Sequence, residues 1–306
     1  MSDVLISGGT GEIGSLLVER LSREARVLVL GRNYEKSERI KKLVERNAIG
    51  FVACDIADRE SLRKVGALPS VTRLIHLAAL VKDSRNVLHD CRELIETNVL
   101  GTIGLLGLLP NVEELYFSST CAVYGQSSGS AVTEAHETRP EGLYGLSKLI
   151  AENTARLYCE DRKIGLSILR ISSVFSPSTH NVNTRRAINI FSDCIRKGAA
   201  ISINGDGESK RDFIYVKDVV DGLLWALNRR KFGVYNISSG TPQSLNDVVN
   251  VLMRVADKRV PVIHRPSSVQ ERNYCYDNSK ATGEGFAPAY DFAKALNEVY
   301  FEGGAE

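Results

Sequence analysis

The stretch GGTGEIG, residues 8–14, spaces three glycines as Gly8-x-x-Gly11-x-x-Gly14 between an apolar strand pattern and the apolar helix pattern SLLVERL. Glycines in that position permit a tight turn, close backbone approach to a pyrophosphate, and a helix N-terminus whose free N–H groups face the anion. A glycine triplet alone is weak evidence, but the strand-turn-helix context is the one that the motif requires. The stretch therefore predicts dinucleotide binding, with Glu12 and Ile13 in the loop as it enters the helix.

Short apolar runs alternate with longer amphipathic stretches through the first half of the chain. The runs predict strands at residues 4–7, 26–30, 50–54, 73–79, 114–119 and 166–174, with helices between them. Alternation at that spacing is typical of β-α-β units, which build a parallel sheet with helices on both faces. We therefore expect an α/β fold with a doubly wound parallel sheet, followed past residue 175 by a smaller, irregular C-terminal region.

Two helices of the C-terminal region have recognisable starts. Asp218 precedes VVDGLLWALN, whose apolar positions have helical spacing, so we expect Asp218 to be the N-cap of that helix. Ser244 and Asp247 have the spacing of a capping box before VVNVLMRV, residues 248–255.

The composition excludes several classes of protein. The 306 residues are 43% apolar and 25% charged, which suffices for a large core, and a net charge of +2 gives no electrostatic case for a nucleic-acid partner. The six cysteines are spread without a C-x-x-C pair, so we expect neither a disulfide framework nor a metal site. The N-terminal residues enter a strand pattern directly, and no apolar run reaches the roughly 18 residues of a membrane span. We expect a cytoplasmic protein with no membrane partner.

The end of the second predicted strand bears on the choice of dinucleotide. An acidic residue there would bind the ribose 2′-hydroxyl of NAD, whereas an arginine suits the 2′-phosphate of NADP. This chain has Gly31 followed by Arg32, which favours NADP(H) over NAD(H), with a solvated loop arginine as the alternative. Asp55, after the third strand, is a candidate for holding the adenine amino group or is simply a turn residue.

The segment LYGLSK, residues 143–148, places Tyr144 and Lys148 on one side of a predicted helix. We expect that side to lie off the packed face, because an apolar stripe points broadly the other way. The stripe consists of Leu146, Leu149, Ile150 and Leu157. A nearby ammonium group and a nicotinamide ring favour the phenolate of a tyrosine, whose pKa is otherwise about 10. Tyr144 is therefore a candidate acid and base, and Thr120 can offer a hydroxyl to the same reacting oxygen.

These residues together resemble the extended short-chain dehydrogenase/reductase family, the nucleotide-sugar epimerases and dehydratases. The matching segments cover nearly the whole chain and are GGTGEIG (8–14), HLAA (76–79), NVLGT (98–102), SSTCAVYG (118–125), YGLSK (144–148), LRISSVFSP (169–177), GDGESKRDFIYVKDV (205–219) and VYNISSG (234–240). The resemblance implies a Rossmann domain over residues 1–174, with returning segments near 214–240, and a discontinuous domain, mainly 175–306, that binds substrate. It also implies a nucleotide-diphosphate sugar as substrate and a homodimer formed largely through helices that include residues 144–148.

The motifs and the resemblance together define a predicted active site. The catalytic residues are Thr120, Tyr144 and Lys148. The cofactor contacts are Gly8, Gly11, Glu12, Ile13, Gly14, Arg32, Asp55, Ile56, Leu77, Ala78, Ala79, Asn98, Tyr144 and Lys148. The substrate contacts are Ser119, Thr120, Ser173, Arg211 and Arg265. Arg211 has a physical case of its own because a guanidinium group pairs with phosphate oxygens bidentately, although ESKRD is also typical of a charged, solvated loop.

Departures from the family pattern bear on the reaction. Where the 4,6-dehydratases have Asp-Glu after the threonine, this chain has Cys121 and Ala122, so no carboxylate pair is evident for elimination. We expect Cys121 to be a small buried residue, with a reactive thiol as the alternative. Ser173 takes the place of an asparagine that commonly contacts the phosphate of the sugar nucleotide, which argues against a standard UDP-hexose.

Two hydride-transfer reactions then compete. A 4-epimerase would use Tyr144 as the base on the C4 hydroxyl during transient oxidation to a 4-keto sugar, whereas an NADPH-dependent 4-keto-sugar reductase would use it as the acid. The overall pattern favours the epimerase, and Arg32 leans toward the reductase. A third hypothesis, dinucleotide binding without catalysis, is disfavoured because Tyr144 and Lys148 are both present.

Overall fold

The computed structural model describes residues 3–82, 87–125, 131–177, 187–267 and 273–303. The chain divides into two compact units. The first comprises residues 1–125, 134–171 and 220–236, and the second comprises residues 126–133, 172–219 and 237–306. Each unit therefore draws on stretches that are far apart in the sequence.

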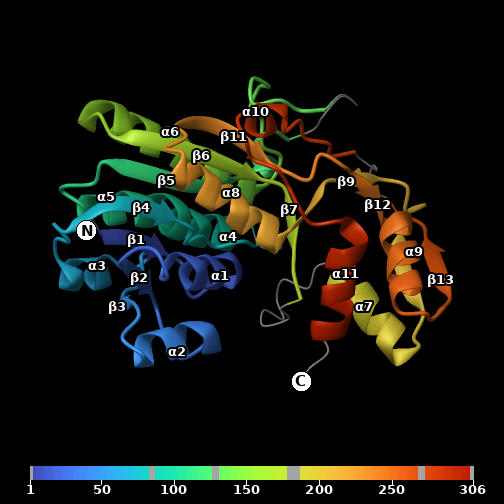
Figure 1. Cartoon of the computed structure of the whole chain (residues 1–306). Coiled ribbons are helices and arrows are strands. Elements are labelled where there is room, and N and C mark those ends of the chain that lie inside the picture. The colour runs from blue at the N-terminus through green and yellow to red at the C-terminus, as the bar shows by residue number, and fades with distance from the viewer. Residues whose placement is uncertain (1–2, 83–86, 126–130, 178–186, 268–272, 304–306) are drawn as a thin grey trace. The chain divides into compact units, whose positions relative to one another are not determined.

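The first unit is built on a seven-stranded sheet. Its strands are β1 (Asp3–Ser7), β2 (Val27–Gly31), β3 (Gly50–Ala53), β4 (Val71–His76), β5 (Glu114–Thr120), β6 (Gly165–Ile171) and β11 (Gly233–Ile237). Their order is β11-β6-β5-β4-β1-β2-β3, and the neighbours from β6 to β3 pair in parallel (Figure 1). Chain progression reverses between β1 and β4, where doubly wound sheets bind ligands at the carboxyl ends of the strands. The predicted fold class is confirmed.

Helices cover both faces of this sheet. They are α1 (Glu12–Leu21), α2 (Glu38–Glu45), α3 (Arg59–Val65), α4 (Val87–Leu94), the π-helical segment η1 (Ile95–Leu100), α5 (Gly101–Gly107), the 3-10 turn η2 (Cys121–Val123), α6 (Leu143–Arg162), and α8 (Val216–Asn228) from its second turn onward. Side chains alternate along β2: Leu28 and Leu30 join the core under α3, α5 and α6. Val29 points to the other face, where it and Val18 of α1 border Gly9.

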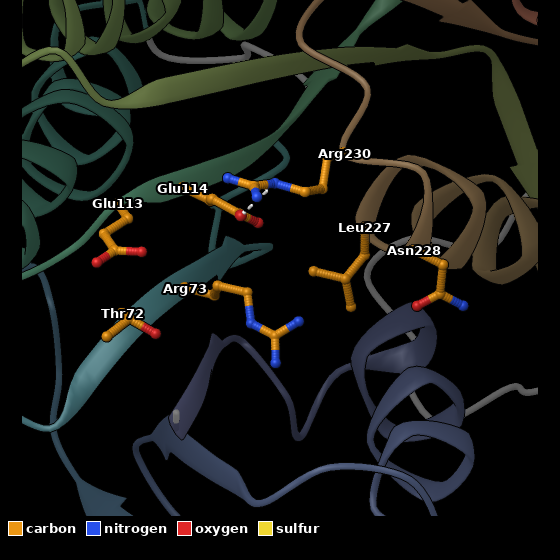
Figure 2. Close-up of a pocket in the computed structure, with 7 residues that line it drawn as sticks. All are labelled: Thr72, Arg73, Glu113, Glu114, Leu227, Asn228 and Arg230. Carbon is orange, nitrogen blue, oxygen red and sulfur yellow. Dashed lines mark ion pairs between the residues drawn. The ribbon is translucent and has the colours of Figure 1, made fainter. Parts of the chain in front are cut away.

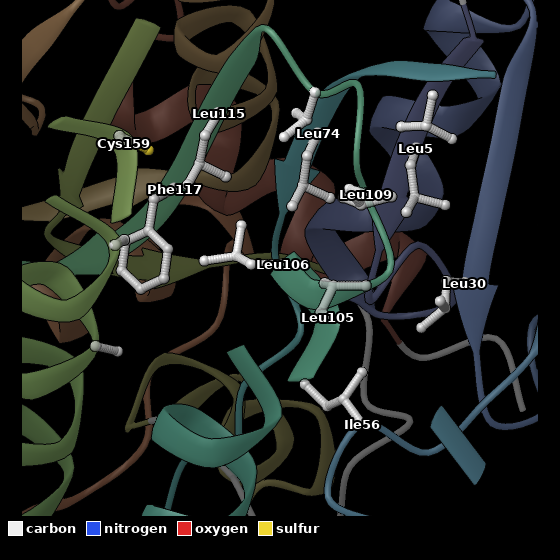
Figure 3. Close-up of a cluster of buried hydrophobic side chains, with 14 of the residues drawn as sticks. Leu5, Leu30, Ile56, Leu74, Leu105, Leu106, Leu109, Leu115, Phe117 and Cys159 are labelled. Atoms are coloured by element: carbon white, nitrogen blue, oxygen red, sulfur yellow. The ribbon is translucent and has the colours of Figure 1, made fainter. Parts of the chain in front are cut away.

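One hydrophobic cluster fills the face of the sheet under α3, α5 and α6. Figure 3 shows strand residues meeting residues of α5, of the turn after it and of α6; those labelled are Leu5, Leu30, Ile56, Leu74, Leu105, Leu106, Leu109, Leu115, Phe117 and Cys159. Each large side chain buried here contributes roughly 2 kcal/mol of transfer free energy. The fully buried residues that α6 contributes to the cluster are small, namely Ala151, Ala155 and Cys159, so this helix can lie close to the sheet; Tyr158, partly buried, packs against the cluster.

The strand predicted over residues 166–174 is in fact two strands. β6 ends at Ile171, and β7 (Ser173–Phe175) pairs instead with β10 (Phe213–Tyr215) in the second unit. The break falls at Ser172, whose hydroxyl donates a 3.1 Å hydrogen bond to the Asp212 carboxylate. An unbroken apolar run does not reveal where a strand leaves its sheet.

The second unit contains short strand pairs and helices. Its remaining elements are α7 (Ala187–Lys197), β8 (Ile201–Asn204), β9 (Lys210–Arg211), β12 (Gln243–Ser244), α9 (Leu245–Val255), β13 (Val262–Arg265), α10 (Ser279–Gly283) and α11 (Phe292–Glu302). β12 pairs with β9, and β13 with β8. The predicted capping box is confirmed: the Asp247 N–H donates to Ser244 Oγ, and the Ser244 N–H donates to the Asp247 carboxylate, each over 3.0 Å.

The helices test two further predictions. Asp218 is not an N-cap, because α8 begins two residues earlier, at Val216, directly after β10. Its carboxylate instead accepts hydrogen bonds from the N–H groups of Ala289 and Tyr290, at 2.7 and 3.3 Å.

Among the described residues, no helix combines the length and the hydropathy that crossing a membrane requires.

Candidate active site

The glycine loop closes tightly on the segment after β4. Gly8 follows β1 with a φ of +72°, and a Cβ atom on it would lie 2.6 Å from the amide nitrogen of Ala78. A Cβ atom on Gly14 would lie 2.3 Å from the carbonyl oxygen of Gly8. Both positions therefore require glycine for the backbone to pack.

Gly11 has a different role, at the N-terminus of α1. It is the N-cap of the helix, and as a glycine it has no side chain that could accept hydrogen bonds from the N–H groups of the first turn. A Cβ atom on Gly11 would meet only the Gly8 carbonyl oxygen within 4 Å, at 3.2 Å. The bare backbone here leaves helical N–H groups for an anion, which the positive end of the helix dipole also attracts. The loop, with Glu12 and Ile13 behind it, therefore fits the pyrophosphate of a dinucleotide.

The ends of β2 and β3 carry the residues predicted at the adenosine end of the cofactor. β2 ends at the buried Gly31, and Arg32 next to it is exposed. The Asp55 carboxylate accepts a 3.0 Å hydrogen bond from the Ala57 N–H. This is the contact of a turn residue, the alternative to holding the adenine amino group. Ile56 is buried and borders Gly101 at the start of α5.

The loop after β4 is held by Asn98. This buried side chain lies in η1; its Oδ1 accepts from the Leu80 N–H at 2.7 Å, and its Nδ2 donates to the Leu80 carbonyl at 3.0 Å and to Ser147 Oγ at 2.9 Å. Ser147 belongs to α6, so one amide ties the loop to that helix. The predicted contacts Leu77, Ala78 and Ala79 form the half-buried start of this loop, directly beside Gly8.

The turn after Thr120 packs closely against the first turn of α6, which carries Tyr144. Thr120 ends β5, and its hydroxyl accepts a 3.2 Å hydrogen bond from the Ala122 N–H. A Cβ atom on Gly145 would lie 2.5 Å from the Ala122 carbonyl oxygen, so the turn after Thr120 packs against the first turn of α6. Both side chains are half-buried. Gly145, next to the tyrosine, is therefore what lets this turn and the helix approach.

The packed face of α6 is the opposite of the one predicted. Leu146, Ile150 and Leu157 of the expected apolar stripe are 42%, 36% and 68% exposed, whereas Lys148 is only 2% exposed. The prediction was wrong because it assumed that the larger apolar side chains face the sheet. The buried side is lined by small residues and by two charged ones, and the residues it buries are Gly145, Ser147, Lys148, Ala151, Glu152, Ala155 and Cys159.

Burial sets the electrostatics of Lys148. Its Nζ lies 4.3 Å from the centroid of the Phe117 ring on β5. Burial lowers the pKa of Lys148 to about 8, and the Glu152 carboxylate acts in the opposite direction. At pH 7 the side chain is therefore still mostly an ammonium ion, which is the form that favours a neighbouring phenolate.

His76 is a buried polar residue that sequence reasoning missed, although HLAA marked its segment. Its Nε2 lies 2.8 Å from Thr102 Oγ1 and its Nδ1 lies 2.5 Å from Ser7 Oγ. Thr102 donates its own proton to the Asn98 carbonyl, so it accepts from Nε2–H, and Nδ1 accepts from Ser7. Burial, with the charge of Lys148, lowers the pKa of His76 to about 3. The ring is therefore neutral and rigidly held beside the lysine.

The predicted substrate residues fall into different surroundings. Ser119 is buried, and its hydroxyl donates to the Glu152 carboxylate. Ser173, Arg211 and Arg265 are exposed and lie in the second unit, on β7, β9 and β13. Cys121 is buried, and its Sγ lies 3.2 Å from the carbonyl oxygen of Arg170, which agrees with the expectation of a small buried residue.

A hollow of about 400 Å³ lies at the amino ends of the strands, opposite to the carboxyl ends that carry the candidate site. It is lined by Thr72, Arg73, Glu113, Glu114, Leu227, Asn228 and Arg230 (Figure 2). Arg230 and Glu114 form an ion pair of 2.9 Å beside it. Because it borders the starts of β4 and β5, this hollow is remote from Thr120 and His76, which lie at the ends of those strands.

One cluster of side chains has the spacing of a metal site. Ligand atoms of His89, Asp90 and Glu93 lie within 4.8 Å of one another. The Lys82 ammonium group already pairs with both carboxylates, at 2.7 Å from Asp90. A lysine thus supplies the positive charge that a metal ion would bring.

Comparisons with known proteins identify the family and the fold. The model of the family described as "NAD dependent epimerase/dehydratase family" matches residues 4–238. A Methanocaldococcus jannaschii protein assigned as a UDP-glucose 4-epimerase is 30% identical over 300 residues, which are 97% of this chain and 96% of that protein. The structure of Thermus thermophilus UDP-glucose 4-epimerase in complex with NAD is 26% identical, with a TM-score of 0.84 over 99% of this chain and 100% of that one. A Methanobrevibacter ruminantium UDP-N-acetylglucosamine 4-epimerase shares the fold at 24% identity, with a TM-score of 0.86 over 98% and 97% of the chains.

Proposed function

This chain belongs to the NAD dependent epimerase/dehydratase family, and we propose that it is a nucleotide-sugar 4-epimerase that acts on a UDP-sugar. Relatives named as UDP-sugar 4-epimerases support the reaction and the nucleotide. The observation that carries the proposal is that the ammonium group of Lys148 is buried on the same side of α6 as Tyr144. The first turn of this helix packs against the turn that follows Thr120.

The chemistry divides between cofactor and protein. A bound nicotinamide supplies a hydride acceptor for C4 of the sugar and later the hydride that returns to it. The Tyr144 phenolate takes the proton of the C4 hydroxyl as a 4-keto sugar forms, and gives it back when the keto sugar is reduced on its other face. Thr120 donates a hydrogen bond to the same oxygen, and the Lys148 charge stabilises the phenolate.

Dehydration of the sugar fits this site poorly. Elimination needs an acid and a base beside the threonine, and this chain has Cys121 and Ala122 there. The Cys121 thiol is buried and directed at a backbone carbonyl, so it offers no exposed acid or base. A 4-epimerase needs no group beyond those already named.

We propose that NADP(H) is preferred to NAD(H). Gly31 places no carboxylate at the end of β2, and the exposed Arg32 guanidinium is suited to a 2′-phosphate. Titration of the purified protein with both dinucleotides tests this, with Arg32→Ala expected to remove the preference. Clearly tighter binding of NAD to the unaltered protein contradicts it.

Exposed apolar side chains on neighbouring helices support a homodimer. Leu100 of η1 and Ile103 of α5 are about half exposed, and Leu146, Ile150 and Leu157 lie on α6, which Asn98 ties to η1. A second copy of the chain would remove this apolar area from water. Leu157→Glu should then shift the sedimentation mass toward the monomer, whereas Phe301→Glu, at a similarly exposed apolar residue on α11, should not. A wild-type monomer at micromolar concentration contradicts the proposal.

Two further assignments accompany the reaction. We infer a reducing compartment, the cytoplasm, because all six cysteines are free thiols.

We also propose that residues of the second unit, Ser173, Arg211 and Arg265, bind the nucleotide diphosphate, since an exposed guanidinium group pairs with phosphate oxygens.

The function is tested by incubating the protein with UDP-hexoses and UDP-hexuronates while following the sugar and the reduced-nicotinamide absorbance. A 4-epimerase interconverts C4 epimers without net change of cofactor, whereas a 4-keto-sugar reductase consumes NADPH stoichiometrically and only with a keto sugar. Tyr144→Phe should abolish turnover and retain dinucleotide binding. Full activity in that variant would refute the catalytic assignment.

A further inference from the structure

A second charged residue is buried on the catalytic side of α6. Glu152 is completely buried and stands one helical turn beyond Lys148 and two beyond Tyr144. The spacing of four residues places the three side chains along one side of the helix. The carboxylate therefore belongs to the surroundings of the reacting groups, and the mechanism above gives it no task.

The carboxylate is held from two different strands. On β6, Arg170 donates from Nε to Oε1 at 3.2 Å and from Nη2 to Oε2 at 2.8 Å, a bidentate pair. On β5, the Ser119 hydroxyl donates to Oε1. The Arg170 guanidinium also lies 4.7 Å from the centroid of the Tyr124 ring. Burial disfavours a charged Arg170, yet its hydrogen bond to Glu152 raises the pKa of the guanidinium.

Stability alone does not account for this pair. A buried ion pair can often be replaced by apolar side chains of similar volume without loss of stability, because desolvation offsets the attraction. What the pair adds is directional contact. The rest of the buried side of α6 is formed mainly by small residues such as Gly145 and Ala151, whose side chains make no hydrogen bonds to the sheet. Ser119 immediately precedes Thr120, so Glu152 joins the helix that carries Tyr144 to the strand that carries the threonine.

The Glu152 carboxylate also lies one helical turn from Lys148 on the same buried side of α6. Of the described groups around the ammonium, Phe117 on β5 is uncharged, and His76 on β4 is kept neutral by burial and by the lysine itself. Arg170 on β6 bonds directly to Glu152. Glu152 is the group whose charge opposes the effect of burial on the pKa of the lysine.

We propose that Glu152 is a positioning residue of this active site: through Ser119 and Arg170 it fixes α6 against β5 and β6, and its charge keeps Lys148 an ammonium ion beside Tyr144. The inference rests on the proposed function, because only a reaction at Tyr144 gives these two effects a use. Glu152 touches neither cofactor nor substrate in this scheme; it acts through the lysine and the serine.

The test replaces Glu152 by glutamine, which keeps the shape and removes the charge. Without the carboxylate, Lys148 should lose its proton at lower pH, so the basic limb of the kcat/KM profile should move to lower pH. The matched control is Glu114→Gln. Glu114 is also buried, accepts a hydrogen bond from Tyr116 and pairs with Arg230, but lies at the far end of β5. The control should lower stability and leave the basic limb in place.

A second measurement does not depend on activity. In protein labelled with ¹³C-lysine, the Cε resonance that disappears in Lys148→Met reports the titration of Lys148. Its midpoint should fall in Glu152→Gln and stay unchanged in Glu114→Gln. If the wild-type protein proves not to be an epimerase, this titration still tests the electrostatic role, so the two failures are distinguishable.

A third variant covers the case in which Glu152→Gln does not fold. The double replacement Glu152→Leu with Arg170→Met exchanges the ion pair for apolar volume, and it should fold, lose activity and lower the Lys148 midpoint by a smaller amount. Equal Lys148 midpoints in wild type and in the folded Glu152 variants, or a double variant with unimpaired turnover and an unmoved basic limb, would overturn the proposal.

Discussion

Replacing Lys148 by methionine should make the protein more stable and inactive. The folded state keeps an ammonium group at 2% exposure, and its pKa falls from an ordinary value of 10.5 to about 8. At 1.36 kcal/mol for each pH unit, holding the charged form in the fold costs about 3 kcal/mol. Methionine has a similar length and no charge to desolvate, so Lys148→Met should raise the free energy of unfolding at pH 7 by up to about 3 kcal/mol.

The gain should depend on pH in a defined way. Between pH 8 and 10.5 the unfolded chain binds more protons at Lys148 than the folded one, so this residue makes wild-type stability rise with pH across that window. The advantage of Lys148→Met is therefore complete below pH 8 and disappears as the pH approaches 10.5. Urea unfolding of both proteins at pH 7 and pH 10, followed by circular dichroism, measures the difference.

A control and an activity measurement complete the experiment. Lys42 is exposed on α2, so Lys42→Met should change stability by no more than about 0.5 kcal/mol at either pH. Turnover in Lys148→Met should fall by about 100-fold or more, because the phenolate loses its stabilising charge. A Lys148→Met variant that is less stable than wild type at pH 7, or whose advantage does not change with pH, would refute the electrostatic reasoning.

Three other changes have defined outcomes. Gly14→Ala introduces a Cβ atom 2.3 Å from the Gly8 carbonyl oxygen, so the loop must shift and NAD(P)H affinity, measured by fluorescence titration, should fall at least about tenfold. Gly145→Ala places a Cβ atom 2.5 Å from the Ala122 carbonyl, and kcat should fall while the affinity for dinucleotide stays within about twofold. The pKa of His76 is about 3 in the fold, so it makes unfolding easier as the pH falls from 6.5 toward 3; in His76→Gln that part of the acid sensitivity, about 4 kcal/mol over the window, should be missing from urea unfolding curves.

The parallel sheet and the glycine loop could be predicted because local sequence determines them. Apolar runs of strand length occur at the periods of β-α-β units, and the glycine spacing reflects two backbone contacts, at Gly8 and Gly14, that no other residue permits. The break after β6 could not be predicted in this way. There the Ser172 hydroxyl donates to the Asp212 carboxylate, and a contact between residues 40 positions apart leaves no local pattern.

The orientation of α6 shows the limit of reasoning from apolar periodicity. Hydrophobic stripes indicate the buried face when the helix packs through large side chains. α6 packs through small residues and through Lys148 and Glu152, which are satisfied by the Phe117 ring and by Arg170. These partners come from distant strands, so the sequence of the helix alone indicated the wrong face. His76 was missed for the same reason, since its partners lie on other elements.

The most direct test of the account uses a UDP-sugar that carries deuterium at C4. If Tyr144 moves the hydroxyl proton while hydride passes to the cofactor and back, the C4 epimer should appear in the proton NMR spectrum with the deuterium still on C4. Tyr144→Phe should form no epimer under the same conditions. Loss of the label to solvent, or no epimer from any UDP-hexose or UDP-hexuronate with either dinucleotide present, would contradict the central claim.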